Sequence, residues 1–212
     1  MTRRTAAALV LPFLVLLGAC SAAVEEEPTT SGSSEDDLTK EPSLTFGTWK
    51  SVTCEPVDAD TFQLRTYRIA ANGVFADWKR YASSTCAAGT ELMTVRMGGS
   101  STVDRLSRVV EHAAEIRVFI DEKAIVPLSS AGLERLAKAC PSAEWTLGKE
   151  RDVTTAGCGA IVPTRAACPV EYDLMRLRGG RLYFGDRSAP LCTEATRPKK
   201  LSVWGIGFAH PL

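Results

Sequence analysis

The stretch GTWKSVTCE, from Gly47 to Glu55, lies at the boundary between two kinds of sequence. The residues before it, SAAVEEEPTTSGSSEDDLTKEPSL (21–44), are polar and acidic and contain little that could build a core. After it, aromatic and β-branched residues recur in short runs between glycine-rich turns, which is typical of β-strands. The sequence therefore predicts a disordered tether over 20–44 and one folded domain over 45–212.

Two runs downstream have the pattern of a β-hairpin, TFQLRTYRIA (61–70) and GVFADWKRY (73–81). Asn72-Gly73 joins them, and this dipeptide readily adopts the positive φ angles of a type I′ turn. Residues 101–120 could hold two strands or one long bent strand. Further strands are expected at 90–97, 124–128, 144–147, 170–178, 181–185 and 200–206.

One segment, residues 129–140, breaks the strand pattern. Ser129 or Ser130 can cap a helix there, and Leu133 and Leu136 share one helical face. Many short strands, glycine-rich turns and one short helix predict a mainly β fold, either a barrel or a sandwich. We favour a closed or nearly closed antiparallel β-barrel, lipocalin-like in outline, because closure leaves no free edge strands.

The start of the chain has the pattern of an export signal. Arg3 and Arg4 precede an apolar run over 5–17, which is too short for a comfortable membrane span. The following Leu-Gly-Ala-Cys at 17–20 resembles the bacterial lipobox. We expect a signal peptide over 1–19 and a lipid on Cys20 that anchors the exported chain to a bacterial membrane, outer or cytoplasmic. The alternative is an ordinary secretory signal with an incidental cysteine.

The charge balance argues against a nucleic-acid partner. The chain has 25 basic and 25 acidic residues, and removal of 1–19 would take away two arginines and no acidic residue. A nearly neutral, slightly acidic chain lacks the basic face that nucleic acids require. Asp-Arg at 104–105 and at 186–187 is interpreted as solvated turn charge.

The cysteines indicate disulfides. Besides Cys20, six remain, and an even number in an exported chain favours disulfide bonds, whose pairing the spacing leaves open. They are Cys54, Cys86, Cys140, Cys158, Cys168 and Cys192. No Cys-x-x-Cys occurs and the only histidines are His112 and His210, so we expect no zinc site, no other metal and no cofactor.

Several of these motifs, taken in order, resemble the adenomatosis polyposis coli down-regulated (APCDD) domain family. The resemblance starts with Trp49-x-Ser51-x-x-Cys54-Glu55 and Phe62-x-x-Arg65. It continues to about Trp204 through the hairpin at Asn72, Cys86, Glu115, Pro-Leu-Ser at 127–129, Cys140, Trp145, Gly148, Asp152-Val153, Gly157-Cys158, Glu171-Tyr172, the strand at 182–185 and Arg197-Pro198.

The resemblance implies a β-barrel-like fold with sequential disulfides. It implies the pairs Cys54–Cys86 and Cys140–Cys158, which leaves Cys168–Cys192 as an addition of this chain. Animal members carry two tandem domains and a C-terminal membrane span, and they inhibit Wnt signalling by holding the acyl chain of Wnt in an apolar pocket. A single domain with a bacterial lipid anchor differs from that arrangement. We therefore expect only the capacity for a fatty-acyl or other apolar ligand to carry over, with Wnt excluded and the protein partner unknown.

The strand patterns suggest which residues would meet such a ligand. Small-ligand sites are mostly apolar with a few placed polar groups, and methionine suits a pliable chain. The expected ligand-binding residues are Phe75, Trp78, Tyr81, Met93, Val95, Val118 and Ile120, with Arg65 for a head group. The alternative is that these side chains fill a small barrel, that Trp49 plugs its end, and that Arg65 is structural.

No catalytic residue is assigned. Ser129 and Ser130 lie outside any Gly-x-Ser-x-Gly motif, and ion pairing of Glu55 or Glu115 with Arg65 is expected in place of a glycosidase-like carboxylate pair. The sequence thus predicts a non-enzymatic, membrane-anchored binding protein. The alternatives are a solid-cored structural or protein-recognition module and, third, a hydrolase that uses buried carboxylates such as Asp152.

Overall fold

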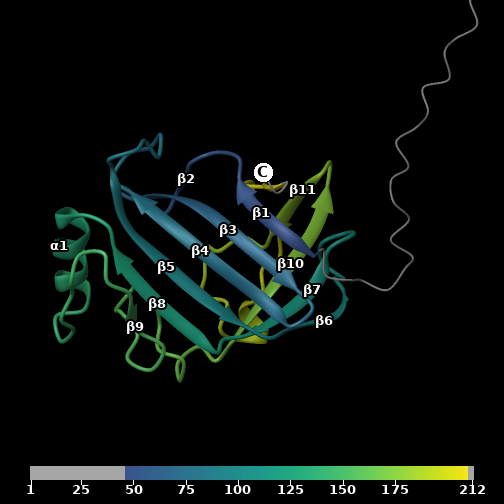
Figure 1. Ribbon diagram of the computed structural model, residues 1–212. Coiled ribbons are helices and arrows are strands. Elements are labelled where there is room, and N and C mark those ends of the chain that lie inside the picture. Colours follow the sequence, from purple (N-terminus) through teal and green to yellow (C-terminus); the bar gives the residue numbers. More distant parts are fainter. Residues whose placement is uncertain (1–45, 210–212) are drawn as a thin grey trace, which may run out of the picture. The chain divides into compact units, whose positions relative to one another are not determined.

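The computed structural model describes residues 46–209 (Figure 1). The expected signal peptide, the lipid-attachment residue Cys20 and the tether lie outside the described residues, as do Thr45 and His210. Within the described range, no helix has the length and apolar character needed to cross a bilayer.

Twelve strands form one antiparallel sheet in the order β6-β7-β10-β11-β12-β1-β3-β4-β5-β8-β9, with β2 paired to β3. The sheet curls into a nearly closed barrel, which confirms the expected fold class (Figure 1). The strands are β1 (Gly47–Ser51), β2 (Glu55–Pro56), β3 (Phe62–Ala70), β4 (Gly73–Tyr81), β5 (Glu91–Gly99), β6 (Ser101–Leu106), β7 (Ala114–Phe119), β8 (Glu122–Pro127), β9 (Arg151–Asp152), β10 (Val170–Arg178), β11 (Arg181–Phe184) and β12 (Ile206–Phe208).

A long bent hairpin curls this sheet. β5 continues into β6 and β7 continues into β8, while β5 pairs with β8 and β6 with β7. At the bend, Phe119 N–H donates to the Ser100 carbonyl (2.8 Å) and Asp121 N–H to that of Gly98 (2.9 Å). The hairpin thereby brings the two ends of the strand order toward each other, and β6 and β9 are the terminal strands of that order.

Some local expectations are confirmed and three are wrong. The hairpin of β3 and β4 forms as expected, but its two turn residues are Ala71 and Asn72, because Ala70 pairs with Gly73. Neither turn residue has the positive φ that a type I′ turn requires, and only Gly73, the first residue of β4, has one (150°), so the expected turn at Asn72-Gly73 is wrong. No strand forms at 144–147, because β9 already occupies the free edge of β8 and Gly148 N–H instead donates to the Pro127 carbonyl. The strand expected at 200–206 shrinks to β12 and a single bridge between Leu201 and Gly185.

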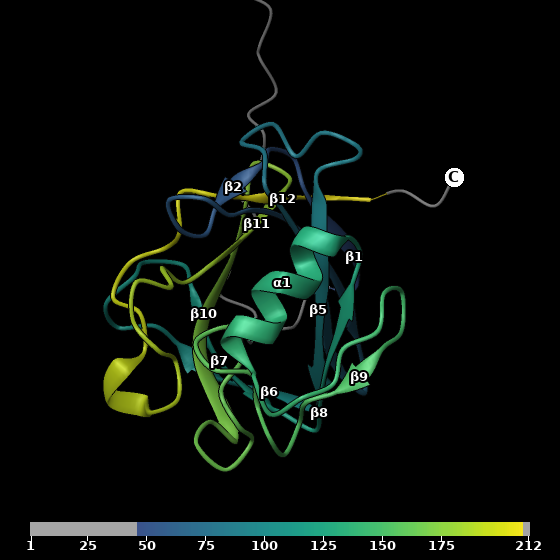
Figure 2. The ribbon, with the colours of Figure 1, turned by 90° about the vertical axis from the view of Figure 1, so that its left-hand side faces the viewer.

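The helix α1 (Ser130–Ala139) divides the interior into two parts. Ser129 caps it by accepting from Gly132 N–H (3.2 Å), and Leu136 is fully buried. Figure 2 shows α1 beside β5 and β8, over which it forms one core with Leu92, Met93, Val95 and Ile125. The other core fills the curl with Trp49, Tyr67, Ile69, Val74, Ala76, Met97, Ala114, Ile116, Met175, Leu182, Phe184 and Ile206.

Three disulfides hold the segments that leave the sheet. They pair Cys54 with Cys86, Cys140 with Cys158 and Cys168 with Cys192, as the resemblance implies. The last one ties the start of β10 to residues 185–200, which include the short helix η1 (Glu194–Thr196) and which we call the strap. Disulfides persist in oxidising compartments, so the folded domain suits an extracytoplasmic location.

The bend predicts one sharp sequence requirement. A Cβ on Gly99 would lie 1.7 Å from the Phe119 carbonyl oxygen, so Gly99→Ala has to push the two strands apart. We expect it to lower the free energy of unfolding by about 2 kcal/mol or more, measured by urea unfolding at constant disulfide content. The exposed Ser100→Ala at the same bend should change it by less than about 0.5 kcal/mol. Equal effects of the two substitutions would contradict the close approach.

Candidate functional site

A small apolar cavity of about 20 Å³ lies inside the curl. One wall comes from β3, β4 and β5 and the other from β7, β10 and β11 and their flanks. A cavity of this size holds about one water molecule and is far below the ~300–1,000 Å³ of ordinary small-ligand sites. Its lining residues are Tyr67, Val74, Ala76, Trp78, Met97, Gly98, Ile116, Val118, Ile120, Glu171, Asp173, Phe184 and Arg187.

Three of the residues expected from the sequence meet at this cavity: Trp78, Val118 and Ile120. Met93 and Val95 lie on the same sheet face as Trp78, but they pack in the second core next to α1. The alternation of residues along a strand does not show which part of the strand a helix will cover. These two residues therefore lie outside the cavity lining.

Phe75 and Tyr81 also lie outside the cavity lining. Phe75 pairs with Gly98 on the outer face of the sheet and packs beneath the Arg68 guanidinium, which lies 4.8 Å from its ring centre. Tyr81 follows a register shift after Arg80 and is buried at the far end of β4. Phe75 and Tyr81 are six residues apart, so strict alternation along 73–81 would place both on one face of the sheet. Alternation does not say which face is inside, and the register shift between Arg80 and Tyr81 changes the side on which Tyr81 lies.

A partly buried ionic group forms the polar end of the cavity. The Arg187 guanidinium contacts the carboxylates of Asp173 (2.8 Å) and Glu171 (3.3 Å). It also lies 5.2 Å from the ring centre of Trp78. The interpretation of Asp-Arg at 186–187 as solvated turn charge was therefore wrong for Arg187, because the strap places this side chain, 29% exposed, at the cavity in contact with two carboxylates.

Asp173 is the most buried carboxylate of this group, with 1% of its surface exposed. Burial raises the pKa of Asp173, whereas the Arg187 guanidinium and the N–H groups of Leu174 (2.7 Å) and Gly185 (2.9 Å) lower it in opposition. With donors on both oxygens, the carboxylate is held in one orientation. It thereby fixes the position of Arg187.

Three lining residues carry buried polar atoms without a hydrogen-bond partner among the described residues. These atoms are the Tyr67 hydroxyl, the Trp78 indole Nε1 and the Nε of Arg187. An unpaired buried donor costs about 1–3 kcal/mol, so three of them around one cavity are unusual in a core that is simply packed. The cavity is therefore suited to an acceptor that enters from outside the chain.

Arg65 has a different place and a structural role. Its Nε lies 2.7 Å from Glu55, both side chains are 4% exposed, and its guanidinium also donates to the Trp204 carbonyl (3.1 Å). Ser51 connects the pair, since its hydroxyl donates to Glu55 (2.6 Å) and accepts from Arg65 N–H (2.8 Å). The Trp-x-Ser-x-x-Cys-Glu motif thus joins β1, β2 and β3, and the expected ion pair of Glu55 with Arg65 is confirmed.

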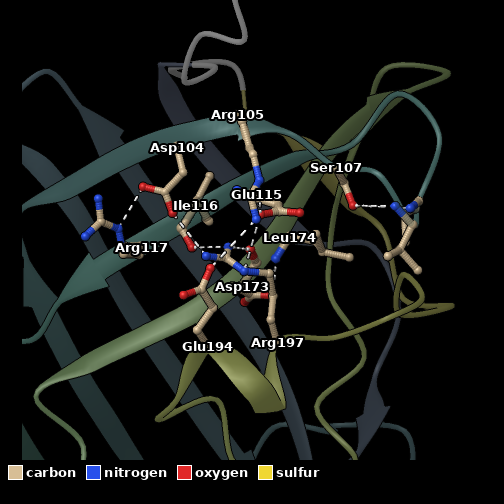
Figure 3. Close-up of polar contacts among 12 residues, drawn as sticks. Asp104, Arg105, Ser107, Glu115, Ile116, Arg117, Asp173, Leu174, Glu194 and Arg197 are labelled. Atoms are coloured by element: carbon tan, nitrogen blue, oxygen red, sulfur yellow. Dashed lines mark hydrogen bonds and ion pairs between the residues drawn. The ribbon is translucent and has the colours of Figure 1, made fainter.

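Glu115 pairs elsewhere, on the outer face of β7 (Figure 3). It contacts Arg105 (3.0 Å) and Arg197 (3.7 Å) in place of Arg65. Arg197 also donates to the carbonyls of Ile116 (3.0 Å) and Asp173 (2.9 Å), which fastens the strap to the sheet. Glu55 and Glu115 therefore belong to separate ion-pair groups.

Lys123 is a further buried charge on the inner face. It pairs with Met97 across the ladder, is 1% exposed, and its Nζ donates to the Pro163 carbonyl (2.9 Å). Burial lowers the pKa of Lys123, and the nearby Glu171 opposes this shift. Nothing in the local sequence EKAIVP distinguished this lysine from a solvated one.

In comparisons with known proteins, no family model and no curated protein matches the chain. The APCDD resemblance therefore stays a prediction. Among residues 46–209, no group of three or more histidine, cysteine, aspartate or glutamate side chains is arranged to hold a metal ion.

The buried Glu55–Arg65 pair predicts a large effect of a nearly isosteric change. Glu55→Gln leaves the Arg65 charge without its counter-ion in a buried place, so we expect a loss of about 3 kcal/mol in the free energy of unfolding. The matched control is Asp77→Asn, which breaks an ion pair with Arg96 whose side chains are both 53% exposed, and it should cost less than about 1 kcal/mol. Urea unfolding of both variants checks this, and a loss below 1 kcal/mol for Glu55→Gln would contradict a structural role.

Lys123 predicts a pH dependence with a defined sign. Its folded-state pKa lies below the usual 10.5, so the unfolded chain binds more protons between the two pKa values. The free energy of unfolding should therefore rise with pH through the folded pKa and level off near 10.5, whereas Lys123→Met should lack this rise. Unfolding curves of the two proteins at several pH values give the difference. Parallel pH profiles would show that Lys123 keeps the pKa of an exposed lysine.

Proposed function

We propose that this chain is a non-enzymatic extracytoplasmic binding protein that takes a fatty-acyl or similar apolar ligand into the interior of its curled sheet. The observation that carries the proposal is the set of three unpaired buried polar atoms on Tyr67, Trp78 and Arg187 around one otherwise apolar cavity. A ligand with an apolar chain and an accepting head group would complete those donors while it covers the apolar walls.

The lining chemistry supports an amphipathic ligand. Ile116, Val118 and Phe184 supply apolar surface, and Met97 supplies a side chain that adapts its shape readily. Arg187 adds a donor at one end, held by Asp173 and Glu171. A carboxylate or ester oxygen is the acceptor that such a guanidinium prefers.

The volume sets a condition on this function. About 20 Å³ cannot hold an acyl chain, so uptake has to part the two walls and move lining side chains. Those walls belong to the two halves of the sheet that meet at the bend of the long hairpin. Binding should therefore be accompanied by a change of conformation, and its rate should be limited by that opening.

The ion pairs support a non-enzymatic role. Glu55 and Glu115 are each engaged by arginines, and Asp152 accepts from Thr154 N–H (2.7 Å). The three carboxylates that a hydrolase would need as catalytic groups are thus each paired with a different partner in the chain. We further propose that lipidated Cys20 holds the domain at a bacterial membrane, where acyl ligands are abundant.

A second candidate is a solid-cored recognition module that acts through its surface. The observation that favours it is the cavity volume itself, since about 20 Å³ leaves the interior nearly filled. In that case, one water molecule would satisfy the unpaired donors. The two candidates differ in whether an acyl chain ever enters the interior.

Native mass spectrometry of the exported protein, purified without detergent, distinguishes them. We expect a co-purifying fatty-acyl mass, and displacement of an acyl-chain fluorophore by added palmitate. Val118→Phe fills the cavity and should abolish both signals. Val103→Phe is the matched control, since Val103 is also half-buried against the same core but does not line the cavity, and it should leave both signals intact.

A protein that is empty and also fails to bind the fluorophore would contradict acyl binding. It would leave the recognition module as the function. Equal loss of signal in both valine variants would show that the ligand does not occupy this cavity.

A further inference from the structure

The outer face of the sheet carries a second hollow, of about 400 Å³, between the edge strand β6 and the strap. Its walls include Asp104, Arg105, Arg117, Tyr172 and Glu194, and Figure 3 shows most of these side chains converging from the two sides. This volume falls within the ~300–1,000 Å³ of small-ligand sites. The hollow is on the opposite side of the sheet from the interior cavity. Ile116 lines that cavity, and the next residue, Arg117, pairs with Tyr172 on the other face of the sheet.

A network of ion pairs fixes the polar atoms of this hollow, which we call the outer groove. Asp104 accepts from Arg117 Nε (2.7 Å) and from the Arg197 guanidinium (3.0 Å). Arg105 contacts Glu115 (3.0 Å) and Glu194 (3.7 Å). Side chains held in this way lose little conformational freedom when a ligand binds.

A β-bulge aims Asp104 at its partners. The register of β6 and β7 shifts between Val103 and Arg105, so Asp104 has no partner across the ladder. Bulges often redirect a side chain next to a functional site. Here the bulged carboxylate lies between the Arg117 and Arg197 guanidinium groups.

Donors remain available after these pairs are made. Arg105 and Arg117 are 53% and 39% exposed, and the terminal nitrogens of Arg117 make no hydrogen bond to the described residues. The exposed Glu194 adds accepting oxygens, and the half-buried Tyr172 adds an aromatic ring that has the Arg197 guanidinium 5.4 Å from its centre. The groove therefore offers fixed donors, fixed acceptors and an aromatic surface together.

The charges of the groove cancel. Asp104 and Glu194 balance Arg105 and Arg117, and behind them Glu115 balances Arg197. A site for an anion or a cation would carry an excess of the opposite charge. Balanced and fixed charges instead suit a ligand that is itself neutral and rich in hydroxyl groups.

We propose that this outer groove binds a neutral saccharide. Its hydroxyl groups donate to the free carboxylate oxygens of Glu194 and accept from the unused nitrogens of Arg105 and Arg117. The apolar face of a sugar ring lies against Tyr172. This site is independent of the interior cavity, so it stands whether or not the domain takes up an acyl chain.

Isothermal titration of the full exported protein with maltotriose, cellotriose and chitotriose tests the proposal. We expect at least one trisaccharide to bind, and Arg117→Gln to weaken that binding at least tenfold. The matched control is Arg96→Gln, which removes another ion-paired surface arginine from a different part of the sheet (53% exposed, against 39% for Arg117), and it should leave the affinity unchanged. The cavity-filling Val118→Phe should also leave it unchanged.

Three results would overturn the proposal. One is the absence of binding for all three sugars at about 10 mM, which is beyond the range of weak specific sites. Another is equal weakening by Arg117→Gln and Arg96→Gln. The third is tighter binding of trigalacturonate than of any neutral trisaccharide, which would assign the groove to anions.

Discussion

The close backbone approach at the bend of the long hairpin is the constraint on which the rest of the structure depends. Gly98 and Gly99 lie against Phe119 and Asp121, where two hydrogen bonds cross between the strands. Without that contact, nothing at the bend would hold β5 and β8 opposite β7 and β10. With it, one antiparallel sheet acquires two opposed walls, an interior core and an inner cavity.

The strap contributes side chains to both faces of the curled sheet. It carries Arg187 to the inner cavity and Arg197 to the outer ion-pair network, and the disulfide of Cys168 with Cys192 lies between them. Arg187 sets the polar end of an otherwise apolar space, and Arg197 fixes Asp104 and Glu115. One irregular segment thus organises both proposed binding sites, which lie on opposite sides of β10.

Local signals in the sequence were sufficient for the elements that local chemistry determines. Asn72-Gly73 predicted the hairpin of β3 and β4, although not the position or type of its turn, and Ser129 predicted the start of α1. Alternation could not tell which face of β4 points inward, so Phe75 was grouped with the ligand-binding residues although it lies outside. The positions of Arg187 at the cavity and of Lys123 in the interior depend on contacts with segments more than ten residues away in sequence, such as Trp78 and Pro163, and no local pattern encodes them.

The central claim is that an acyl chain enters the space next to Trp78, and the indole N–H signals of the tryptophans test it most directly. A fatty acid with a nitroxide near its methyl end broadens the signal of any nearby N–H in a ¹H–¹⁵N spectrum. The account predicts stronger broadening of the Trp78 signal than of the Trp145 signal, since both rings pack against the second core but only Trp78 lines the cavity. An unchanged Trp78 signal at saturating fatty acid, or equal broadening of both signals, would contradict it.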